Sequence, residues 1–191
     1  MVKVDFIIVG QGLAGSALAM ALMRRGKSVA VVDNNDPSSA TRVAAGLVTT
    51  LAGKGMNPAW RQAEYLPEAI GYYQKLERES GTALFYPLPV LRLFKDAKEA
   101  TKFSRKADSV KKWVAKEVAE IPSNQLHAEF GGFEMSQGGR LDTVAYLRVV
   151  RQKIESEGLY LEQNFDEATV DFSDESVIWK GIQAQKIIVC Q

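Results

Sequence analysis

The stretch Asp5-Phe6-Ile7-Ile8-Val9-Gly10-Gln11-Gly12-Leu13-Ala14-Gly15 decides how this chain begins to fold. A near-continuous apolar run comes first, which is typical of a strand covered on both faces in a parallel sheet. Three glycines follow with the spacing G-x-G-x-x-G, and apolar residues then recur at helical spacing until Gly26. The stretch therefore predicts a strand over residues 4–9, a tight glycine turn and a helix over residues 14–25.

A second strand, over residues 28–32, ends at Asp33 and completes the pattern of a nucleotide-binding unit. Gly10 permits the turn, Gly12 lets backbone amides approach a pyrophosphate at the helix N-terminus, and Gly15 lets the helix pack closely on the strand. The Asp33 carboxylate can accept hydrogen bonds from both ribose hydroxyls of an adenosine, whereas it would repel a 2′-phosphate. We therefore expect the ADP moiety of FAD or NAD, and not NADP.

The position of the third strand separates these two cofactors. A nicotinamide domain usually continues at once with another helix and strand. Here residues 34–57 are rich in Asn, Ser, Thr, Ala and Gly, which indicates a loop, and the next good strand of the sheet begins only at Leu159. This long excursion favours a flavoprotein.

Three segments resemble the superfamily of FAD-dependent D-amino-acid oxidase, glycine oxidase and sarcosine oxidase. The opening from Asp5 to Asp33 is similar to the N-terminus of that family. Residues 38–47, Ser-Ser-Ala-Thr-Arg-Val-Ala-Ala-Gly-Leu, are similar to its loop along the pyrophosphate towards the isoalloxazine, and residues 181–191 resemble its core strand that runs into a glycine contacting FAD. The resemblance implies FAD as the cofactor and oxidation of a C–N bond of an amine or amino acid.

The motif and the resemblance together imply a set of cofactor-binding residues. The Ser39 hydroxyl can reach phosphate oxygens, Gly46 lets the chain pass close to a flat ring, and Phe165 falls where the family presents backbone to the adenine. Arg42 can neutralise phosphate or, equally well, pair with a surface acid. No residue is assigned a catalytic role. The expected cofactor-binding residues are Gly10, Gly12, Leu13, Ala14, Gly15, Asp33, Asn34, Ser39, Arg42, Ala45, Gly46, Leu47 and Phe165.

The expected fold class is α/β: a Rossmann-like FAD/NAD(P)-binding domain with a parallel sheet and an antiparallel hairpin crossover, plus part of an α+β substrate domain. Residues 1–82 and 159–191 are assigned to the first domain, and residues 83–158 to an inserted, partial substrate domain. Four short strands are expected near the end, in the order strand, hairpin, core strand, over residues 159–163, 168–172, 177–180 and 186–190.

The middle of the chain predicts three helices. The first is opened by Asn57 and Pro58 and ends at Ser80, with a kink or a division into two consecutive helices at Pro67. The second runs over residues 96–118, opened by Asp96, and the third over residues 142–158. An edge or irregular strand is expected over residues 84–94, and a turn-rich hairpin over residues 131–140.

Composition excludes several other classes of function. The 24 basic and 23 acidic residues nearly cancel and are interspersed, so we expect no nucleic-acid partner. Neither a signal peptide nor a membrane span is recognisable, which predicts a cytoplasmic protein. The family resemblance implies a small-molecule substrate. The lone histidine, His127, lacks companions for a metal site or a triad, and the lone cysteine, Cys190, is expected to be a buried structural thiol.

Other readings of the sequence stay open. A flavin-dependent hydroxylase and a nicotinamide-using dehydrogenase share the opening motif, and the chain could be an ADP-binding module without activity. Lys54, Arg61 and Arg92 could face a carboxylate substrate, although most such cations are solvated. Family members are longer than this chain, so we expect an N-terminal fragment that is inactive alone, and a full-length gene ending at Gln191 would refute this hypothesis. The sequence does not determine the substrate, the electron acceptor or the oligomeric state.

Overall fold

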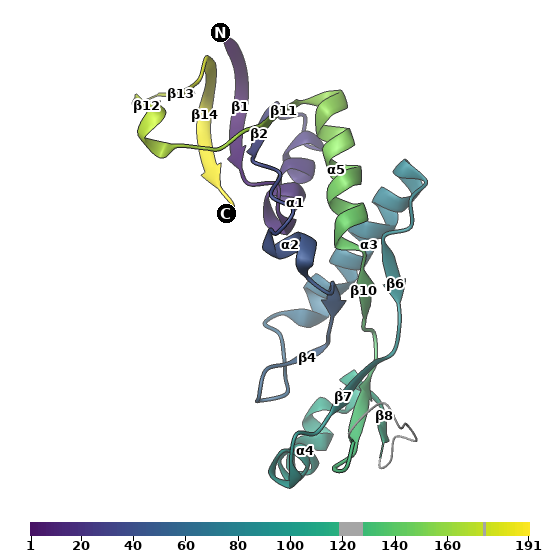
Figure 1. The fold of residues 1–191 in the computed structure, drawn as a ribbon. Helices are drawn as coiled ribbons and strands as arrows, with labels where there is room; N and C mark the ends of the chain where they lie inside the picture. Colours follow the sequence, from purple (N-terminus) through teal and green to yellow (C-terminus); the bar gives the residue numbers. More distant parts are fainter. Residues whose placement is uncertain (119–127, 174) are drawn as a thin grey trace. The chain divides into compact units, whose positions relative to one another are not determined.

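The computed structural model describes residues 1–118, 128–173 and 175–191, which form two compact units (Figure 1). The first unit joins residues 1–44 to residues 143–191, and the second comprises residues 45–142. The beginning and the end of the chain, purple and yellow in Figure 1, therefore belong to the same unit.

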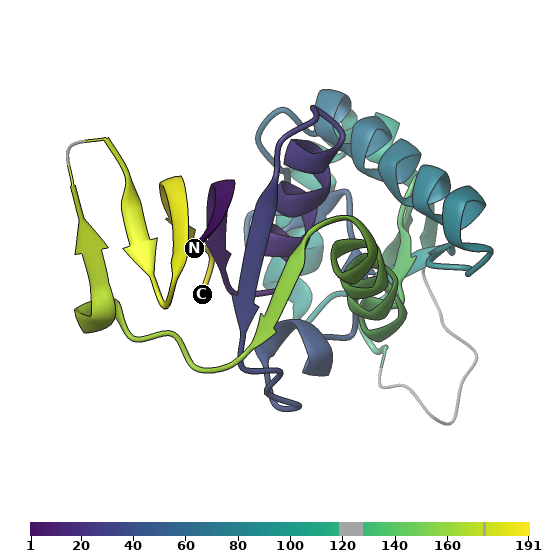
Figure 2. The ribbon, with the colours of Figure 1, turned by 90° about the horizontal axis from the view of Figure 1, so that it is seen from above.

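A six-stranded sheet forms the centre of the first unit (Figure 2). The strands, in their order across the sheet, are β11 (Leu159–Glu162), β2 (Val29–Asp33), β1 (Val2–Val9), β14 (Ile182–Val189), β13 (Val177–Trp179) and β12 (Val170–Phe172). The first four strands run parallel to one another. β13 pairs antiparallel with β14, and β12 pairs antiparallel with β13, so these two strands add a hairpin at one edge. This is the predicted parallel sheet with its hairpin crossover.

Helices α1 (Leu13–Met23) and α5 (Thr143–Glu157) lie against each other in the first unit, and α1 also contacts β1 and β2. The buried side chains of α5 include Tyr146, Leu147, Val150 and Ile154, which recur at helical spacing and form an apolar stripe. The short helix α2 (Ala40–Val43) also contacts α5.

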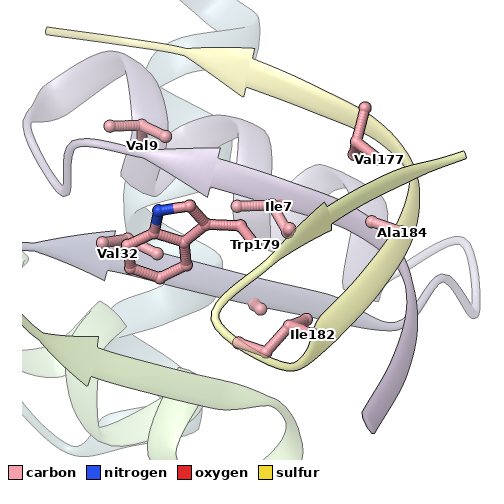
Figure 3. Close-up of a cluster of buried hydrophobic side chains, with 8 residues drawn as sticks. Ile7, Val9, Val32, Val177, Trp179, Ile182 and Ala184 are labelled. Carbon is pink, nitrogen blue, oxygen red and sulfur yellow. The ribbon is translucent and has the colours of Figure 1, made fainter. Parts of the chain in front are cut away.

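A core of apolar side chains joins the parallel strands to the hairpin (Figure 3). Trp179 of β13 is fully buried, and its indole Nε1 donates a hydrogen bond of 3.0 Å to the Thr169 hydroxyl. It belongs to the same cluster as Ile7 and Val9 of β1 and Val32 of β2. Ile7 and Val9 share one face of β1 because side chains alternate along a strand. The hairpin therefore covers one face of β1 and β2.

The described residues of the second unit form three small sheets and two long helices. Strands β3 (Leu47–Val48), β10 (Gly139–Leu141) and β6 (Phe85–Pro87) form one sheet, β4 (Leu51–Ala52) and β5 (Asn57–Pro58) another, and β7 (Val90–Leu93), β9 (Gly132–Met135) and β8 (Val114–Val118) the third. The helices are α3 (Gln62–Ser80) and α4 (Ala97–Val110). Phe103 of α4 stacks on Phe133 of β9, with 4.4 Å between ring centroids. Among the described residues, no helix has the length and apolar character needed to cross a membrane.

Two helix predictions in this unit need correction. The first helix begins at Gln62 and not at Asn57, because residues 57–58 pair with β4 and Arg61 has a left-handed backbone (φ 51°) that a helix cannot include. It then continues through Pro67 as one helix, so the alternative of two consecutive helices is wrong. The second helix ends at Val110, because residues 114–118 form a strand that pairs with β9.

The expected hairpin over residues 131–140 is also wrong, because its two strands belong to different sheets. β9 pairs with β7 and β8, whereas β10 pairs with β3 and β6. The two compact units also differ from the predicted domain boundaries: residues 45–82 lie in the second unit, and α5 lies in the first. The reason is that α5 packs on α1, while β3 pairs with β10.

Candidate functional site

The glycine turn lies at the carboxyl end of β1, between β1 and α1. Gly10 has a φ of +96°, which side-chain-bearing residues rarely adopt, and its N–H donates to the Val32 carbonyl at 2.8 Å. A Cβ atom on Gly15 would lie 1.9 Å from the Gly10 carbonyl oxygen, closer than any real contact. Gly15 therefore allows the helix to start directly against the turn, as predicted.

The N-terminus of α1 presents free hydrogen-bonding capacity beside this turn. Gly12 is the N-cap residue, it supplies no side-chain cap, and the first turn contains no acidic residue. The Leu13 N–H donates to the Thr41 hydroxyl at 3.1 Å, which places α2 beside the helix start. The positive end of the helix dipole and the N–H groups of the first helical turn favour a bound anion. These residues fit the diphosphate of an ADP moiety.

Asp33 stands at the end of β2 with its carboxylate held by two backbone amides. Oδ2 accepts from the Gln11 N–H at 2.7 Å, and Oδ1 accepts from the Asn35 N–H at 2.8 Å. The side chain keeps 20% of its surface exposed. A carboxylate oxygen can accept more than one hydrogen bond, so both oxygens retain capacity for ribose hydroxyls. Asp33 and the helix N-terminus therefore lie where the motif predicts the ribose and diphosphate contacts of an ADP moiety.

An arginine from α5 reaches this carboxylate. Arg151 lies with Nη2 4.0 Å from Asp33 Oδ1 and donates through Nε to Gln11 Oε1 at 2.9 Å. Its guanidinium also lies over the Tyr160 ring, 4.4 Å from the centroid. Burial raises the pKa of the Tyr160 hydroxyl to about 12, and this hydroxyl has no hydrogen-bond partner among the described residues. The Tyr160 phenol is therefore neutral at physiological pH.

The other predicted residues of the first unit differ in their placement. Leu13 and Ala14 open α1 beside the turn, whereas Asn34 is exposed and accepts from the Asp36 N–H. Ser39 is the N-cap of α2 without a side-chain cap bond. Arg42 donates to Asn35 Oδ1 at 2.6 Å, so it contacts the segment after β2.

Phe165 and Cys190 both belong to the first unit, and each follows the carboxyl end of a strand, β11 and β14 respectively. The Phe165 side chain packs on the core cluster beside Trp179, with 5.6 Å between ring centroids. Its proposed backbone contact with adenine stays a prediction. Cys190 is partly exposed and not buried as expected, because it lies just beyond the last residue of β14; partial burial nevertheless raises the pKa of its thiol.

Ala45, Gly46 and Leu47 belong to the second unit. Gly46 has a φ of +70°, and its carbonyl accepts from the Leu141 N–H at 2.9 Å. Leu47 is 62% exposed and begins β3. The structure thus brings the glycine turn, Asp33 and Arg42 into one unit, and it places this loop in another. The role of the loop towards a cofactor stays a prediction.

The suggested carboxylate-binding cations also lie in the second unit. Arg92 forms an ion pair with Glu99 at 2.6 Å and donates to the Gly53 carbonyl, and Arg61 lies over the Trp60 ring and pairs with Glu64. Two of the three cations are therefore already engaged. His127 lies outside the described residues. Within the described part, no cluster of His, Cys, Asp and Glu side chains could hold a metal ion.

Sequence reasoning missed Gln11, Asn35, Arg151 and Tyr160. Gln11 stands inside the glycine motif, but the motif assigns no role to its side chain. Arg151 is separated from it by 140 residues, so no local pattern connects the two. Only the packing of α5 on α1 brings them together.

Comparison with known proteins gives a family match over nearly the whole chain. The family model described as "FAD dependent oxidoreductase" matches residues 5–190. An uncharacterized oxidoreductase, YurR, of Bacillus subtilis (strain 168) is 31% identical over 108 residues, which is 54% of this chain and 28% of the relative.

Two solved structures share the fold. Glycine oxidase from Geobacillus kaustophilus has a TM-score of 0.80 at 16% identity, covering 100% of this chain and 56% of that one. Iminodiacetate oxidase from Chelativorans sp. BNC1 has a TM-score of 0.71 at 22% identity, covering 97% of this chain and 54% of that one. The chain therefore spans little more than half the length of these two structures, and its matched part covers 28% of the curated relative.

Proposed function

Since this chain belongs to the FAD dependent oxidoreductase family, whose model spans residues 5–190, we propose that it supplies the FAD-binding part of an enzyme that oxidises a C–N bond of an amine or amino acid. FAD is the cofactor of the family. The names of the two solved neighbours, a glycine oxidase and an iminodiacetate oxidase, support this substrate class. A cytoplasmic location remains a prediction from the sequence.

The observation that carries the proposal is that the Asp33 carboxylate lies beside the N-terminus of α1, because it accepts a hydrogen bond from the N–H of Gln11, the residue before the N-cap Gly12. The Asp33 carboxylate would accept the adenosine ribose hydroxyls, and the N–H groups beyond Gly12 would donate to the diphosphate. FAD held by Asp33 and the start of α1 would supply the electron-accepting chemistry of the reaction. The residues of this chain bind and orient it. No residue here needs to act as a base.

The length of the solved neighbours limits what this chain does alone. They are almost twice as long, so we assign to these 191 residues the nucleotide-binding part and expect no amine oxidation from them in isolation. The activity belongs to the natural protein that contains these residues.

The test is anaerobic reduction of the flavin in that natural protein. We expect a yellow protein whose flavin absorbance near its visible maximum bleaches on addition of an amine or amino acid and returns with oxygen or another acceptor. Bleaching only by NADH or NADPH would instead indicate a hydroxylase or a dehydrogenase. A colourless protein that binds ADP would reduce the assignment to an ADP-binding module. Either of these results would contradict the proposed activity.

A further inference from the structure

Arg151 contacts both residues that hold the Asp33 carboxylate. Its Nε donates to the side chain of Gln11 at 2.9 Å, and its Nη2 donates to Asn35 Oδ1, also at 2.9 Å. Gln11 and Asn35 are the residues whose backbone N–H groups donate to Asp33. The Arg151 side chain is 17% exposed and is therefore mostly shielded from solvent.

Gln11 is fixed at both ends of its side-chain amide. Its Nε2 donates to the Leu147 carbonyl of α5 at 2.8 Å, and its Oε1 accepts from Arg151. The residue is 3% exposed, so these bonds are shielded from water. A buried amide with both ends paired has one favoured position, because any other position leaves a polar group unsatisfied. The Gln11 side chain thus joins the glycine turn to α5 through two hydrogen bonds.

Asn35 is fixed in a backbone conformation that needs support. Its φ of 56° is left-handed, which asparagine tolerates but which remains uncommon. Its Oδ1 accepts from Arg42 at 2.6 Å and from Arg151 at 2.9 Å, and its Nδ2 donates to Glu162 at 3.2 Å. These bonds anchor the residue whose backbone N–H donates to Asp33 Oδ1. Arg151 therefore stabilises the second amide as well as the first.

We propose that Arg151 is a positioning residue for the adenosine ribose: by holding Gln11 and Asn35, it fixes the Asp33 carboxylate in the orientation that receives the ribose hydroxyls. The inference rests on the proposed function, since it concerns the ADP moiety of FAD. A planar guanidinium donates through Nε and Nη2 in a fixed fork, which a lysine ammonium cannot reproduce. Direct attraction to Asp33 is secondary at 4.0 Å beside the 3.5 Å pair that Arg151 makes with Glu162.

The test compares two ligands that differ only in the ribose. Dissociation constants for ADP and for 2′,3′-dideoxy-ADP are measured by calorimetry for the 191-residue chain, for Arg151→Met and for Arg151→Lys. We expect both variants to bind ADP about tenfold more weakly, in the range of coupling between contacting residues, and to bind the dideoxy ligand within about twofold of the parent chain. The exposed Arg148 of the same helix provides the control: Arg148→Met should bind both ligands like the parent.

A merely structural role for Arg151 predicts another pattern. A general loss of stability lowers the affinity for ADP and for 2′,3′-dideoxy-ADP by the same factor. That result would overturn the proposal, and so would an unchanged affinity for ADP. If Arg151→Met does not fold, Arg151→Lys provides the test of the proposal, because it retains the positive charge and loses only the paired Nε and Nη2 donors. In an Asp33→Ala background, Arg151→Lys should have no further effect on ADP affinity, since the positioned carboxylate is gone.

The outcome separates this inference from the proposed function. If the parent chain binds ADP and Arg151→Lys weakens it selectively, the inference holds even where the natural protein oxidises no amine. If the natural protein oxidises amines and the variants bind ADP like the parent, the inference fails and the function stands. Absence of ADP binding by the parent chain overturns both.

Discussion

Gly15 is the residue of the glycine turn at which an added side chain would collide most closely with the backbone. A Cβ there would lie 1.9 Å from the backbone oxygen of Gly10, and backbone cannot move aside as a flexible side chain can. The helix and the turn would have to separate, which would displace the N–H groups at the start of α1.

Substitution Gly15→Ala should therefore destabilise the first unit and abolish measurable ADP binding. Gly71→Ala in α3 is the matched control, because a Cβ at Gly71 meets nothing within 4 Å. Alanine at an exposed interior helix position should be neutral or stabilising by about 0.5–1 kcal/mol. Thermal unfolding and ADP titration of both variants check this. Equal behaviour of the two alanines would contradict the packing described for Gly15.

The residues that the sequence identifies and those that it misses differ in the range of their contacts. Gly10, Gly12, Gly15 and Asp33 could be predicted because a strand, a turn and a helix are adjacent in sequence and each glycine has a local reason to be there. Arg151 could not be predicted, because its role depends on how α5 packs, and any arginine on a helix is by default an exposed charge.

Among the elements, α4 shows a helix start that its sequence predicts in detail. The Asp96 side chain accepts from the Glu99 N–H at 2.8 Å, and Glu99 in turn accepts from the Lys95 N–H at 2.8 Å. The hydrogen bond from the Lys95 N–H is the largest cause that lowers the pKa of Glu99 below its ordinary value of 4.5. Arg92 lowers it further. The end of the same helix could not be predicted, because residues 114–118 keep an apolar pattern while pairing with β9.

Glu99→Gln should remove part of the acid sensitivity of the second unit. A carboxyl group with a lowered folded-state pKa stabilises the fold above its ordinary pKa, and this stabilisation is lost as the pH falls through the folded-state value. We expect Glu99→Gln to melt at a lower temperature than the parent at pH 7 and to approach it near pH 3. The exposed Asp108 gives the control, Asp108→Asn, which should keep the difference from the parent constant. A pH-independent gap for Glu99→Gln would contradict this account.

At the scale of the whole molecule, the N- and C-terminal segments combine to make one unit. β14 pairs with β1 along seven residue pairs, so the sheet is complete only when the last strand joins the first. The succession of strands along the chain, including the hairpin crossover, could be predicted because each strand has its own apolar run and turn signals. The limits of the units differ from the predicted domains because they depend on pairing between distant segments, such as β3 with β10.

The central claim is that the first unit binds the ADP moiety of FAD through Asp33 and the start of α1. The most direct measurement is the melting temperature of the 191-residue chain with and without ADP or FAD, for the parent and for Asp33→Ala. Binding to the folded state at about 100 times the dissociation constant should stabilise the parent by about 2.7 kcal/mol, and Asp33→Ala should lose most of this gain. No shift of the parent at saturating ligand, or an equal shift in Asp33→Ala, would contradict the claim.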